Sequence, residues 1–555
     1  MGGVNLIKLL IGTRVIDSIK FDRCTINSIK TQKKLLFGII RKNRNTLYGK
    51  EHGFSSMKTV EDFQKKVSVN NYESLRPYIK KIMRGDRRVL TKEKAIFFGI
   101  TSGTTSKPKF IPVTKRSRMQ KSKVMSVWLY RVLTDHPEAL KGKALVIMSP
   151  AVEGYASSGV PYGSESGDAY KNMPSLIRKH YALSYEVFCI KDYEARYYAM
   201  LRIGIEADVT NISTMNPLTI LVLCQKIDKY AKDIIEDIRR GSLNRSINID
   251  PSIRKAIEKT LKPNPNRALF LEKLLMEKGA LLPKDFWKGL ALVACWTGGT
   301  VGLYVKELAK YLPPDIKMRD FGYVSTEARC SVPVSDGGPS GILTSGSNFY
   351  EFIPEEDIEK KEPRYLTVDK VKKGGRYYII FTTPGGLYRY NIDDIIRVVG
   401  FQKSAPVIEF IQKGKNISSA TGEKLYEAQI IDAIYKAKES TGINVEFFCA
   451  CLEWQIPPSY SFLVEFTEEH DAGKKKHFLS HIEESLGKIN IEYKAKRSSQ
   501  RLGNPKLKVL EKGSFEKFRK ARLAILQHDS QFKACHLRCD FKIPTEFKII
   551  EEIPL

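Results

Sequence analysis

The chain has 555 residues, of which 42% are hydrophobic and 10% aromatic. This length exceeds what one compact core normally holds, so we expect two or more domains, and the apolar content excludes a disordered chain. Lys and Arg number 92 against 62 Asp and Glu, which gives a formal net charge of +30.

The basic charge has more than one interpretation. It is typical of surfaces that bind nucleic acid or anionic membranes, and it also favours anionic ligands such as nucleotides. The basic residues are scattered along the chain and form no Arg-rich arm. We therefore favour an ordinary solvated surface and predict no nucleic-acid partner.

Cysteine usage and hydropathy bear on location. The nine cysteines contain no C-x-x-C pair, which is the pattern of free thiols in a reducing cytoplasm. No stretch approaches 18 consecutive apolar residues, so no transmembrane segment is expected. The sequence predicts a cytoplasmic protein.

The first part of the chain predicts helices and then an α/β pattern. Residues 1–95 show apolar pairs at helical spacing. Short apolar runs at 143–150 and 289–299 are typical of buried strands, and 217–239 is expected to form a long amphipathic helix that Pro217 opens. This alternation predicts a mainly parallel α/β sheet.

The pattern changes twice towards the C-terminus. Residues 340–400 are rich in β-branched and aromatic side chains, which predicts a smaller β subdomain. A new α+β pattern starts near 412, with helices expected at 425–439, 475–488 and 514–527 and strands at 443–453, 459–466 and 506–511. We therefore predict a large N-terminal domain, 1–411, and a small mobile C-terminal domain, 412–555, joined by a polar hinge at 412–416.

A hydroxyl-rich glycine loop is the sharpest local signal. The segment TSGTTSKPK, Thr101 to Lys109, follows an apolar run and precedes a probable helix that starts at Thr114. A strand, such a loop and a helix in succession can surround phosphate oxygens with backbone N–H groups, hydroxyls and a lysine. The segment is not a Walker A loop. An ordinary polar turn is the alternative interpretation.

Two acidic segments follow. In FGYVSTE, 321–327, Glu327 is placed to hold Mg²⁺ through nucleotide phosphates and Tyr323 to stack on a base, unless Glu327 is a surface residue after a turn. In GLYRYNIDDIIRVVGF, 386–401, an acidic pair interrupts an apolar β segment. A carboxylate can accept from both hydroxyls of a ribose. For Asp393 we favour a tight turn, and for Asp394 the ribose contact.

These three segments, in this order, resemble the adenylate-forming superfamily. More closely, with LYGKEHGF, ISSATGEKLYE and GSFEKFRKAR also matching, the chain resembles the Gretchen Hagen family of acyl-acid amido synthetases. That family is known from auxin and jasmonate conjugation in plants and has bacterial relatives, and this chain resembles a bacterial-type member. The resemblance covers nearly the whole chain. It implies a large adenylate-forming α/β domain with mixed sheets and a β subdomain, followed by a small α+β domain.

The resemblance also implies an activity. The protein would be an ATP- and Mg²⁺-dependent ligase that activates a carboxylic acid as an acyl-adenylate, releases pyrophosphate and passes the acyl group to an amine, in particular an amino acid. A monomer is expected. Two alternatives stay open: an acyl-CoA ligase with the same first step, and a catalytically weakened nucleotide-binding protein.

The resemblance assigns roles residue by residue. Glu327 and Lys533 would be catalytic, with Glu327 also the metal ligand. The nucleotide would contact Ser102, Gly103, Thr104, Thr105, Gly298, Gly299, Tyr323, Thr326, Asp394, Lys413 and Lys424. The family usually has Gly, Gly and Arg where this chain has Ser106, Asp393 and Lys413, which predicts weaker ATP binding.

Overall fold

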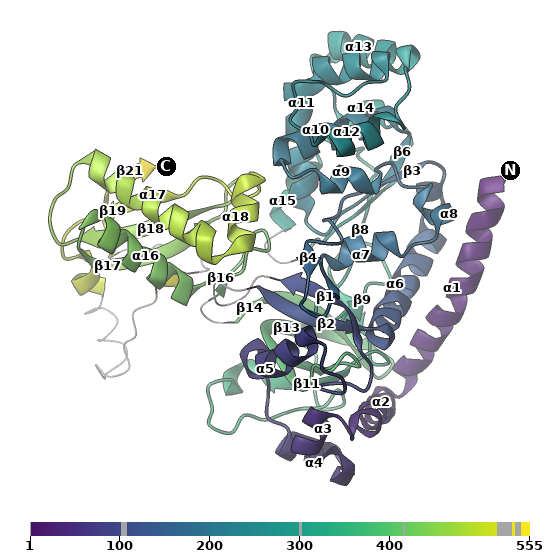
Figure 1. Ribbon diagram of the computed structural model, residues 1–555, viewed down its shortest axis with the longest axis vertical. Coiled ribbons are helices and arrows are strands. Elements are labelled where there is room, and N and C mark those ends of the chain that lie inside the picture. The colour runs from purple at the N-terminus through teal and green to yellow at the C-terminus, as the bar shows by residue number, and fades with distance from the viewer. Residues whose placement is uncertain (1, 102–107, 299–301, 415–416, 519–535, 539–545) are drawn as a thin grey trace. The chain divides into compact units, whose positions relative to one another are not determined.

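The computed structural model describes residues 2–101, 108–298, 302–414, 417–518, 536–538 and 546–555 (Figure 1). The chain divides into two compact units. The first holds Met1–Ile100 and Phe110–Gln412, and the second holds Thr101–Lys109 and Lys413–Leu555. Among the described residues, no helix has both the length and the apolar character that crossing a membrane requires.

The first unit begins with helices, as the apolar spacing predicts. They are α1 (Gly2–Ile26), α2 (Ser28–Asn43), α3 (Leu47–Glu51), α4 (Val60–Lys66) and α5 (Tyr72–Arg84). Polar caps define their starts: Thr59 and Asn71 each form a reciprocal capping box at the head of α4 and α5. The buried faces of α2 to α5 pack on the core of the six-stranded sheet described below.

A four-stranded sheet carries the glycine loop. Its order is β2 (Lys109–Thr114), β1 (Ala95–Thr101), β5 (Pro161–Gly163) and β4 (Gly154–Tyr155). The helix that follows, α6 (Lys115–Asp135), is capped by Thr114 as expected. The expected strand–loop–helix order is wrong in one respect. The apolar, β-branched segment of β2 pairs with β1, so a strand separates the loop from the N-terminus of α6.

A parallel sheet confirms the α/β alternation. Its order is β3 (Lys143–Val146), β6 (Val209–Ser213), β7 (Leu292–Ala294) and β8 (Lys317–Arg319), with every neighbouring pair parallel. The long predicted helix is α11 (Pro217–Arg240), which Asn216 caps. The other helices of this region are α7 (Glu165–Lys171), α8 (Ser175–Arg178), α9 (Tyr185–Cys189), α10 (Tyr193–Glu206), α12 (Pro251–Glu258), α13 (Pro265–Lys278), α14 (Pro283–Phe286) and α15 (Gly302–Leu308).

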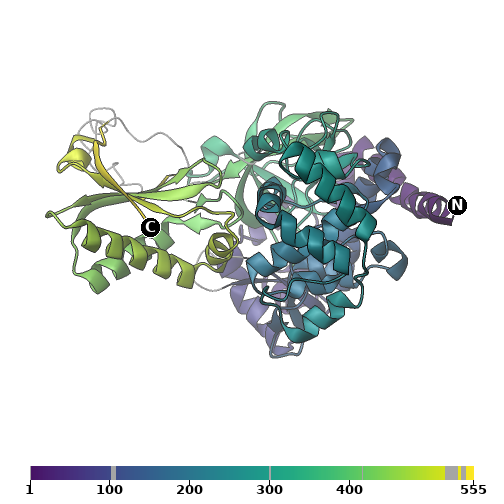
Figure 2. The ribbon, with the colours of Figure 1, turned by 90° about the horizontal axis from the view of Figure 1, so that it is seen from above.

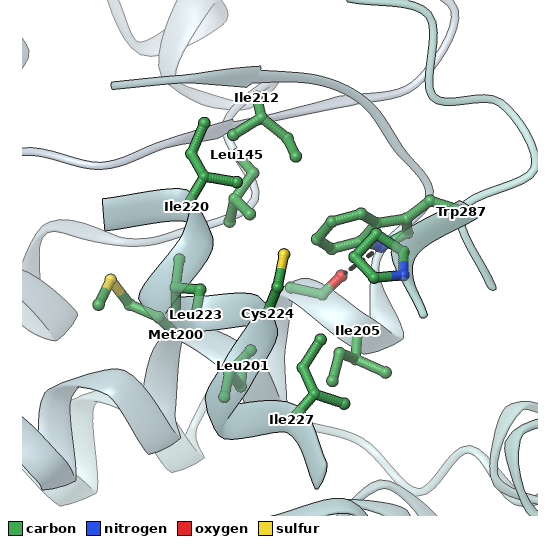
Figure 3. Close-up of a pocket in the computed structure, with 12 residues that line it drawn as sticks. Leu145, Met200, Leu201, Ile205, Ile212, Ile220, Leu223, Cys224, Ile227 and Trp287 are labelled. Atoms are coloured by element: carbon green, nitrogen blue, oxygen red, sulfur yellow. Dashed lines mark hydrogen bonds between the residues drawn. The ribbon is translucent and has the colours of Figure 1, made fainter. Parts of the chain in front are cut away.

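A small apolar cavity of about 10 Å³ lies beside this parallel sheet (Figure 3). Leu145 of β3, Met200 of α10, Cys224 of α11 and Trp287 line it, among other apolar residues. Burial raises the pKa of the Cys224 thiol to about 12, so this thiol stays protonated. A void of this size holds at most about one water and is too apolar to attract one. We therefore regard it as a packing gap.

The predicted β subdomain is a six-stranded antiparallel sheet. Its order is β11 (Phe349–Pro354), β12 (Arg376–Thr382), β13 (Tyr390–Gln402), β14 (Ala405–Lys413), β10 (Gly341–Leu343) and β9 (Ser331–Val332). Apolar side chains of these strands and of the N-terminal helices form one buried cluster. Within it, Arg389 pairs with Glu351, and both side chains are almost fully buried.

The second unit is the predicted α+β domain. A five-stranded sheet runs β20 (Leu537–Arg538), β17 (Val445–Glu453), β18 (Ser459–Phe466), β19 (Lys506–Leu510) and β21 (Ile549–Pro554). Helices α16 (Glu427–Thr441) and α17 (Ala472–Ile489) cover one face of it (Figure 2). The short pair β15 (Ile417–Ser418) and β16 (Leu425–Tyr426) precedes α16.

Among the described residues of this unit, the sequence analysis missed five elements: α18 (Ile491–Ser498), β15, β16, β20 and β21. Each is short or carries charges that mask its periodicity. Residues 514–518, at the start of the helix expected at 514–527, are helical. The rest of that expected helix lies outside the described residues.

Candidate functional site

Six of the predicted site residues lie outside the described residues: Ser102, Gly103, Thr104, Thr105, Gly299 and Lys533. Ser106, where the chain departs from the family pattern, lies outside them as well. The geometry below therefore concerns Gly298, Tyr323, Thr326, Glu327 and Asp394 of the first unit, and separately Lys413 and Lys424 of the second.

Tyr323 and Asp394 meet in the interior of the first unit. The Tyr323 hydroxyl donates a hydrogen bond of 2.5 Å to Asp394 Oδ2, although the two residues are 71 positions apart. The Tyr323 ring also stacks on Phe410, with centroids 5.9 Å apart. Burial, reinforced by the negative charge of Asp394, raises the pKa of Tyr323 well above its usual value. Tyr323 is thus a permanent donor that fixes one carboxylate oxygen.

A bulge in β13 places Asp394. Tyr378 pairs with Ile395 and Ile380 pairs with Asn391, so two steps along β12 oppose four along β13. Inside the bulge Asp393 adopts a left-handed φ of 58°, and the Asn391 side chain accepts its N–H at 2.9 Å. Glycine is favoured at such a φ, and Asp is among the residues that tolerate it.

The bulge also separates the two acidic side chains. Asp394 is 3% exposed, whereas Asp393 is exposed. The Asp393 carboxylate therefore lies at the surface of the first unit, whereas the Asp394 carboxylate lies in its interior.

Thr326 and Glu327 lie in a tight turn that Ser325 and Ala328 close through reciprocal hydrogen bonds. Lys121 of α6 donates to the Thr326 carbonyl at 2.6 Å and pairs with Glu165 at 2.5 Å. Sequence reasoning missed Lys121 because nothing local distinguishes it from the other lysines.

Glu327 and Lys121 line one small polar cavity of about 20 Å³, together with Arg329, Ser117 and Thr383. Glu327 itself is 6% exposed. A cavity of this volume has room for about one water. A buried carboxylate at the wall of a cavity is the kind of oxygen donor that a hard divalent cation takes together with phosphate oxygens.

Asp320, which sequence reasoning also missed, ties two of the predicted segments together. It is 2% exposed. Its Oδ2 accepts the Thr297 N–H at 2.5 Å and the Thr297 hydroxyl at 2.8 Å, and its Oδ1 accepts the Gly322 N–H at 2.6 Å. One carboxylate therefore fixes both the residue before Gly298 and the residue before Tyr323.

Burial raises the pKa of Asp320 to about 6, although its hydrogen bonds act in the opposite direction. A positional signal for this residue existed. Asp320 follows the last residue of β8 directly, and the carboxyl ends of parallel strands are where such sheets build ligand sites.

Two glycines allow close approaches in this region. A methyl group on Gly298 would lie 2.4 Å from Pro339 Cβ, and one on Gly99 of β1 would lie 2.6 Å from Thr326 Cγ2. Both distances are shorter than any normal carbon–carbon contact. Only glycine therefore lets the 298 segment reach Pro339 and β1 reach Thr326.

In the second unit, Lys424 ends a turn that begins at Thr421. Glu423 in this turn is fully buried and accepts the N–H groups of Ala420 and Thr421, both at 2.7 Å. Lys424 takes a left-handed φ of 45°. Lys413 is the last residue of β14 and is half-buried. The division of the chain falls between Gln412 and Lys413, within the segment predicted to be the hinge.

Models of three domains of one family match the chain in order. They are the GH3 family N-terminal domain over residues 18–317, the GH3 family central domain over 341–413 and the GH3 family C-terminal domain over 428–540. Together these ranges cover well over half of the chain.

Curated proteins and a solved structure agree with these matches. Jasmonoyl–L-amino acid synthetase JAR4 of Nicotiana attenuata is 25% identical, over 93% of this chain and 92% of the relative. Indole-3-acetic acid-amido synthetase GH3.3 of Arabidopsis thaliana is 24% identical, over 91% and 88%. The structure of AtGH3.15 acyl acid amido synthetase in complex with 2,4-DB has the same fold, with a TM-score of 0.67, 21% identity and coverage of 98% and 97%. The chain therefore belongs to the GH3 family of acyl-acid amido synthetases and is a ligase of the adenylate-forming kind.

Proposed function

We propose that the first unit binds ATP where Tyr323, Asp394 and Glu327 lie, and that the activated acid is then passed to the amino group of an amino acid. The observation that carries this assignment is the Tyr323–Asp394 hydrogen bond. It fixes one carboxylate oxygen at the rim of a β bulge, as the recognition of a ribose diol requires. The hydrogen bonds from the Thr297 and Gly322 N–H groups to Asp320 support the assignment. They hold two of the predicted nucleotide-binding segments next to each other.

Activation of the acid is an electrostatic problem. A carboxylate is a poor acyl donor because its leaving group would be oxide, and attack on the ATP α-phosphate turns that oxygen into part of AMP. An anion must then approach a polyanion, so cationic and N–H groups that neutralise the α-phosphate lower the barrier. We assign this role to the 102–105 loop, to Lys533 and, through its contact with the Thr326 carbonyl, to Lys121 as a positioning residue.

Glu327 fits a magnesium ion that is shared with the phosphates. Mg²⁺ in such sites usually takes one or two carboxylates and completes its shell with phosphate oxygens and water, and the buried Glu327 carboxylate on a polar cavity offers one such ligand. When bound, the ion supplies charge neutralisation at the phosphates. The protein's part is to hold Glu327 in place through the Ser325–Ala328 turn.

The amine reaction requires no side-chain nucleophile, because the acyl-adenylate is already a strong acyl donor. The 412–416 segment is proposed as the hinge about which the second unit moves between the two half-reactions. A monomeric state and a cytoplasmic location stay predictions from the sequence.

ATP–pyrophosphate exchange over a panel of carboxylic acids tests this function. The relatives' names suggest jasmonic and indole-3-acetic acids as the first members. Product mass after addition of an amino-acid panel separates amide formation from acyl-CoA formation, for which CoA is the added acceptor. Absence of exchange with every acid of the panel would favour a nucleotide-binding protein without ligase activity.

Two variants test the site within that assay. Glu327→Gln and Lys533→Ala should each lower the exchange rate by about 10²–10³, with a modest change in ATP binding. The Lys533→Ala variant should convert a supplied acyl-adenylate to amide nearly as fast as the wild type. Glu362→Gln, on an exposed loop of the first unit, is the matched control for charge removal. Exchange at the wild-type rate in Glu327→Gln would contradict the assignment.

A further inference from the structure

The first unit holds the Arg329 guanidinium in its interior without giving it an oxygen acceptor. Its Nε is buried and has no hydrogen-bond partner among the described residues. The one hydrogen bond of its side chain within the described part of the chain runs from Nη1 to Met125 Sδ, at 3.1 Å. Because a thioether sulfur is a weak acceptor, the protein itself satisfies little of the donor capacity of this side chain.

The backbone around Arg329 is fixed relative to Glu327. Arg329 forms a β bridge with Val324, and its carbonyl accepts a hydrogen bond from the Thr344 hydroxyl at 2.8 Å. The turn closed by Ser325 and Ala328 lies between the two bridged residues. Since Glu327 belongs to that turn, one short and rigid segment carries both the carboxylate proposed to bind Mg²⁺ and the guanidinium.

The acidic side chain whose charge reaches Arg329 is already engaged by another cation. Glu165 acts electrostatically on Arg329, but its ion pair is with Lys121, at 2.5 Å. Burial lowers the pKa of Arg329, and the charge of Glu165 opposes this effect. An arginine keeps its charge at physiological pH. The free-energy cost of removing this charge from water therefore persists, and an incoming anion would offset it.

The cavity that Arg329 lines admits only a small group. Arg329, Glu327 and Lys121 lie on its wall, and its volume of about 20 Å³ is room for about one water. A phosphate group, with four oxygens around its phosphorus, exceeds this volume. A carboxylate is the smallest oxyanion among the reactants, and its two oxygens match the parallel N–H groups of a guanidinium. The cavity therefore suits the head group of an acid.

We propose that Arg329 binds the carboxylate of the acid substrate at this cavity and holds it for attack on the ATP α-phosphate. The catalytic role rests on the proposed function, whereas the binding of a carboxylate to Arg329 is measurable without turnover. In the attack, one carboxylate oxygen forms a bond to the α-phosphorus. The bond from that phosphorus to the oxygen it shares with the β-phosphorus breaks, and its electron pair leaves with pyrophosphate. By neutralising the approaching carboxylate, the guanidinium lowers the repulsion between two anions.

Acetate is the probe for carboxylate binding without turnover. Saturation-transfer NMR on the full-length protein should detect acetate binding to the wild type. Arg329→Met should weaken that binding roughly 10-fold or more, since charge-assisted hydrogen bonds are lost. Arg329→Lys should recover part of the affinity, because lysine keeps the charge but not the planar fork. Arg87→Met, at an exposed arginine of the first unit, is the matched control and should bind acetate as the wild type does.

ATP–pyrophosphate exchange gives the second reading. With any acid of the panel that supports exchange, Arg329→Met should raise the KM for the acid roughly 10–100-fold and leave the KM for ATP within about threefold. A rise in the KM for ATP alone would mean that Arg329 contacts a phosphate, and it would overturn the proposal. Urea unfolding of Arg329→Met and Arg329→Lys checks that both variants are folded.

The possible results separate the carboxylate site from the overall function. Equal acetate affinity in Arg329→Met and Arg87→Met, or no acetate binding to the wild type, would overturn the site even if exchange is robust. Selective loss of acetate binding in Arg329→Met, in a protein that shows no exchange with any acid of the panel, would support the site and reject the ligase assignment.

Discussion

Replacement of Asp320 by Asn separates the free-energy cost of burying this carboxylate from its role in positioning the neighbouring segments. The change removes the charge and keeps the shape. The folded protein raises the pKa of this group from 3.8 to about 6, which corresponds to about 3 kcal/mol of penalty on the charged form. The amide, however, has one acceptor oxygen, and its NH₂ faces either the Thr297 or the Gly322 N–H, at a cost of about 1–3 kcal/mol. The two effects oppose each other, so we expect stability at pH 7 to change by less than about 2 kcal/mol.

The raised pKa of Asp320 determines whether the free energy of unfolding rises or falls with pH. Between pH 3.8 and about 6 the folded state binds more protons at Asp320 than the unfolded state does. The contribution of this group to the free energy of unfolding therefore falls as the pH rises through that window. Urea unfolding at pH 4.5 and pH 7 should show this component in the wild type and its loss in Asp320→Asn.

ATP binding is the functional readout of the same variant. If Asp320 positions the segments before Gly298 and Tyr323, Asp320→Asn should raise the KM for ATP roughly 10-fold with a smaller effect on kcat. In the wild type the KM should also rise as the pH falls below about 6, where the carboxyl group becomes protonated. Asp285→Asn is the control, because Asp285 is a buried acid paired with Lys278. An Asp320→Asn enzyme with the wild-type KM and an unchanged pH profile would refute the positioning role.

Three further substitutions test the geometry. Tyr323→Phe removes the hydroxyl that donates to Asp394 and should lower the free energy of unfolding by about 1–3 kcal/mol, as urea denaturation will show; an unchanged midpoint would mean that the bond contributes nothing. Asp393→Gly should alter stability by less than about 1 kcal/mol, whereas Asp393→Val should cost about 1–2 kcal/mol at this left-handed position; equal midpoints for the two would exclude backbone strain at the bulge. Gly204→Ala, within α10 and beside the apolar cavity, should stabilise the folded protein by about 0.5 kcal/mol through helix propensity. The new methyl group would lie 3.3 Å from Leu145 Cδ1, which can move into the adjacent cavity. A lower melting temperature of this variant would show that the cavity cannot take up the displaced side chain.

The sequence predicted those structural features that depend on residues close together along the chain, such as helix starts and turns. The Asn216 cap followed by Pro217 marks the start of α11, and the alternation of apolar runs with helical segments marks the parallel sheet. The motif around Asp393 and Asp394 indicated a turn at Asp393, and this residue takes a left-handed conformation in the bulge of β13.

Tertiary partners were not predictable from such signals. Nothing near Lys121 indicates that its ammonium group reaches the Thr326 carbonyl, 205 positions away. The hydrogen bonds of Asp320 to Thr297 likewise depend on the adjacency of β7 and β8, which the pattern of apolar residues does not specify. β2 was missed because a six-residue strand beside a polar loop has no periodicity that distinguishes it from the start of a helix.

The bulge in β13 separates the acidic residues Asp393 and Asp394 from the regular pairing of β13 with β12. Regular pairing resumes at Ile395 with Tyr378 and continues to Arg397 with Arg376, and on the other side Asn391 and Tyr390 keep their partners. Two steps along β12 oppose four along β13 here, so a substitution between Asn391 and Ile395 need not shift the register of these two strands. A family member can thus exchange the residue next to Asp394, as this chain has done with Asp393, while the pairing of the sheet on either side is kept. The same property makes 392–394 the segment in which the proposed ribose contact of Asp394 can be varied with the least disturbance of the sheet.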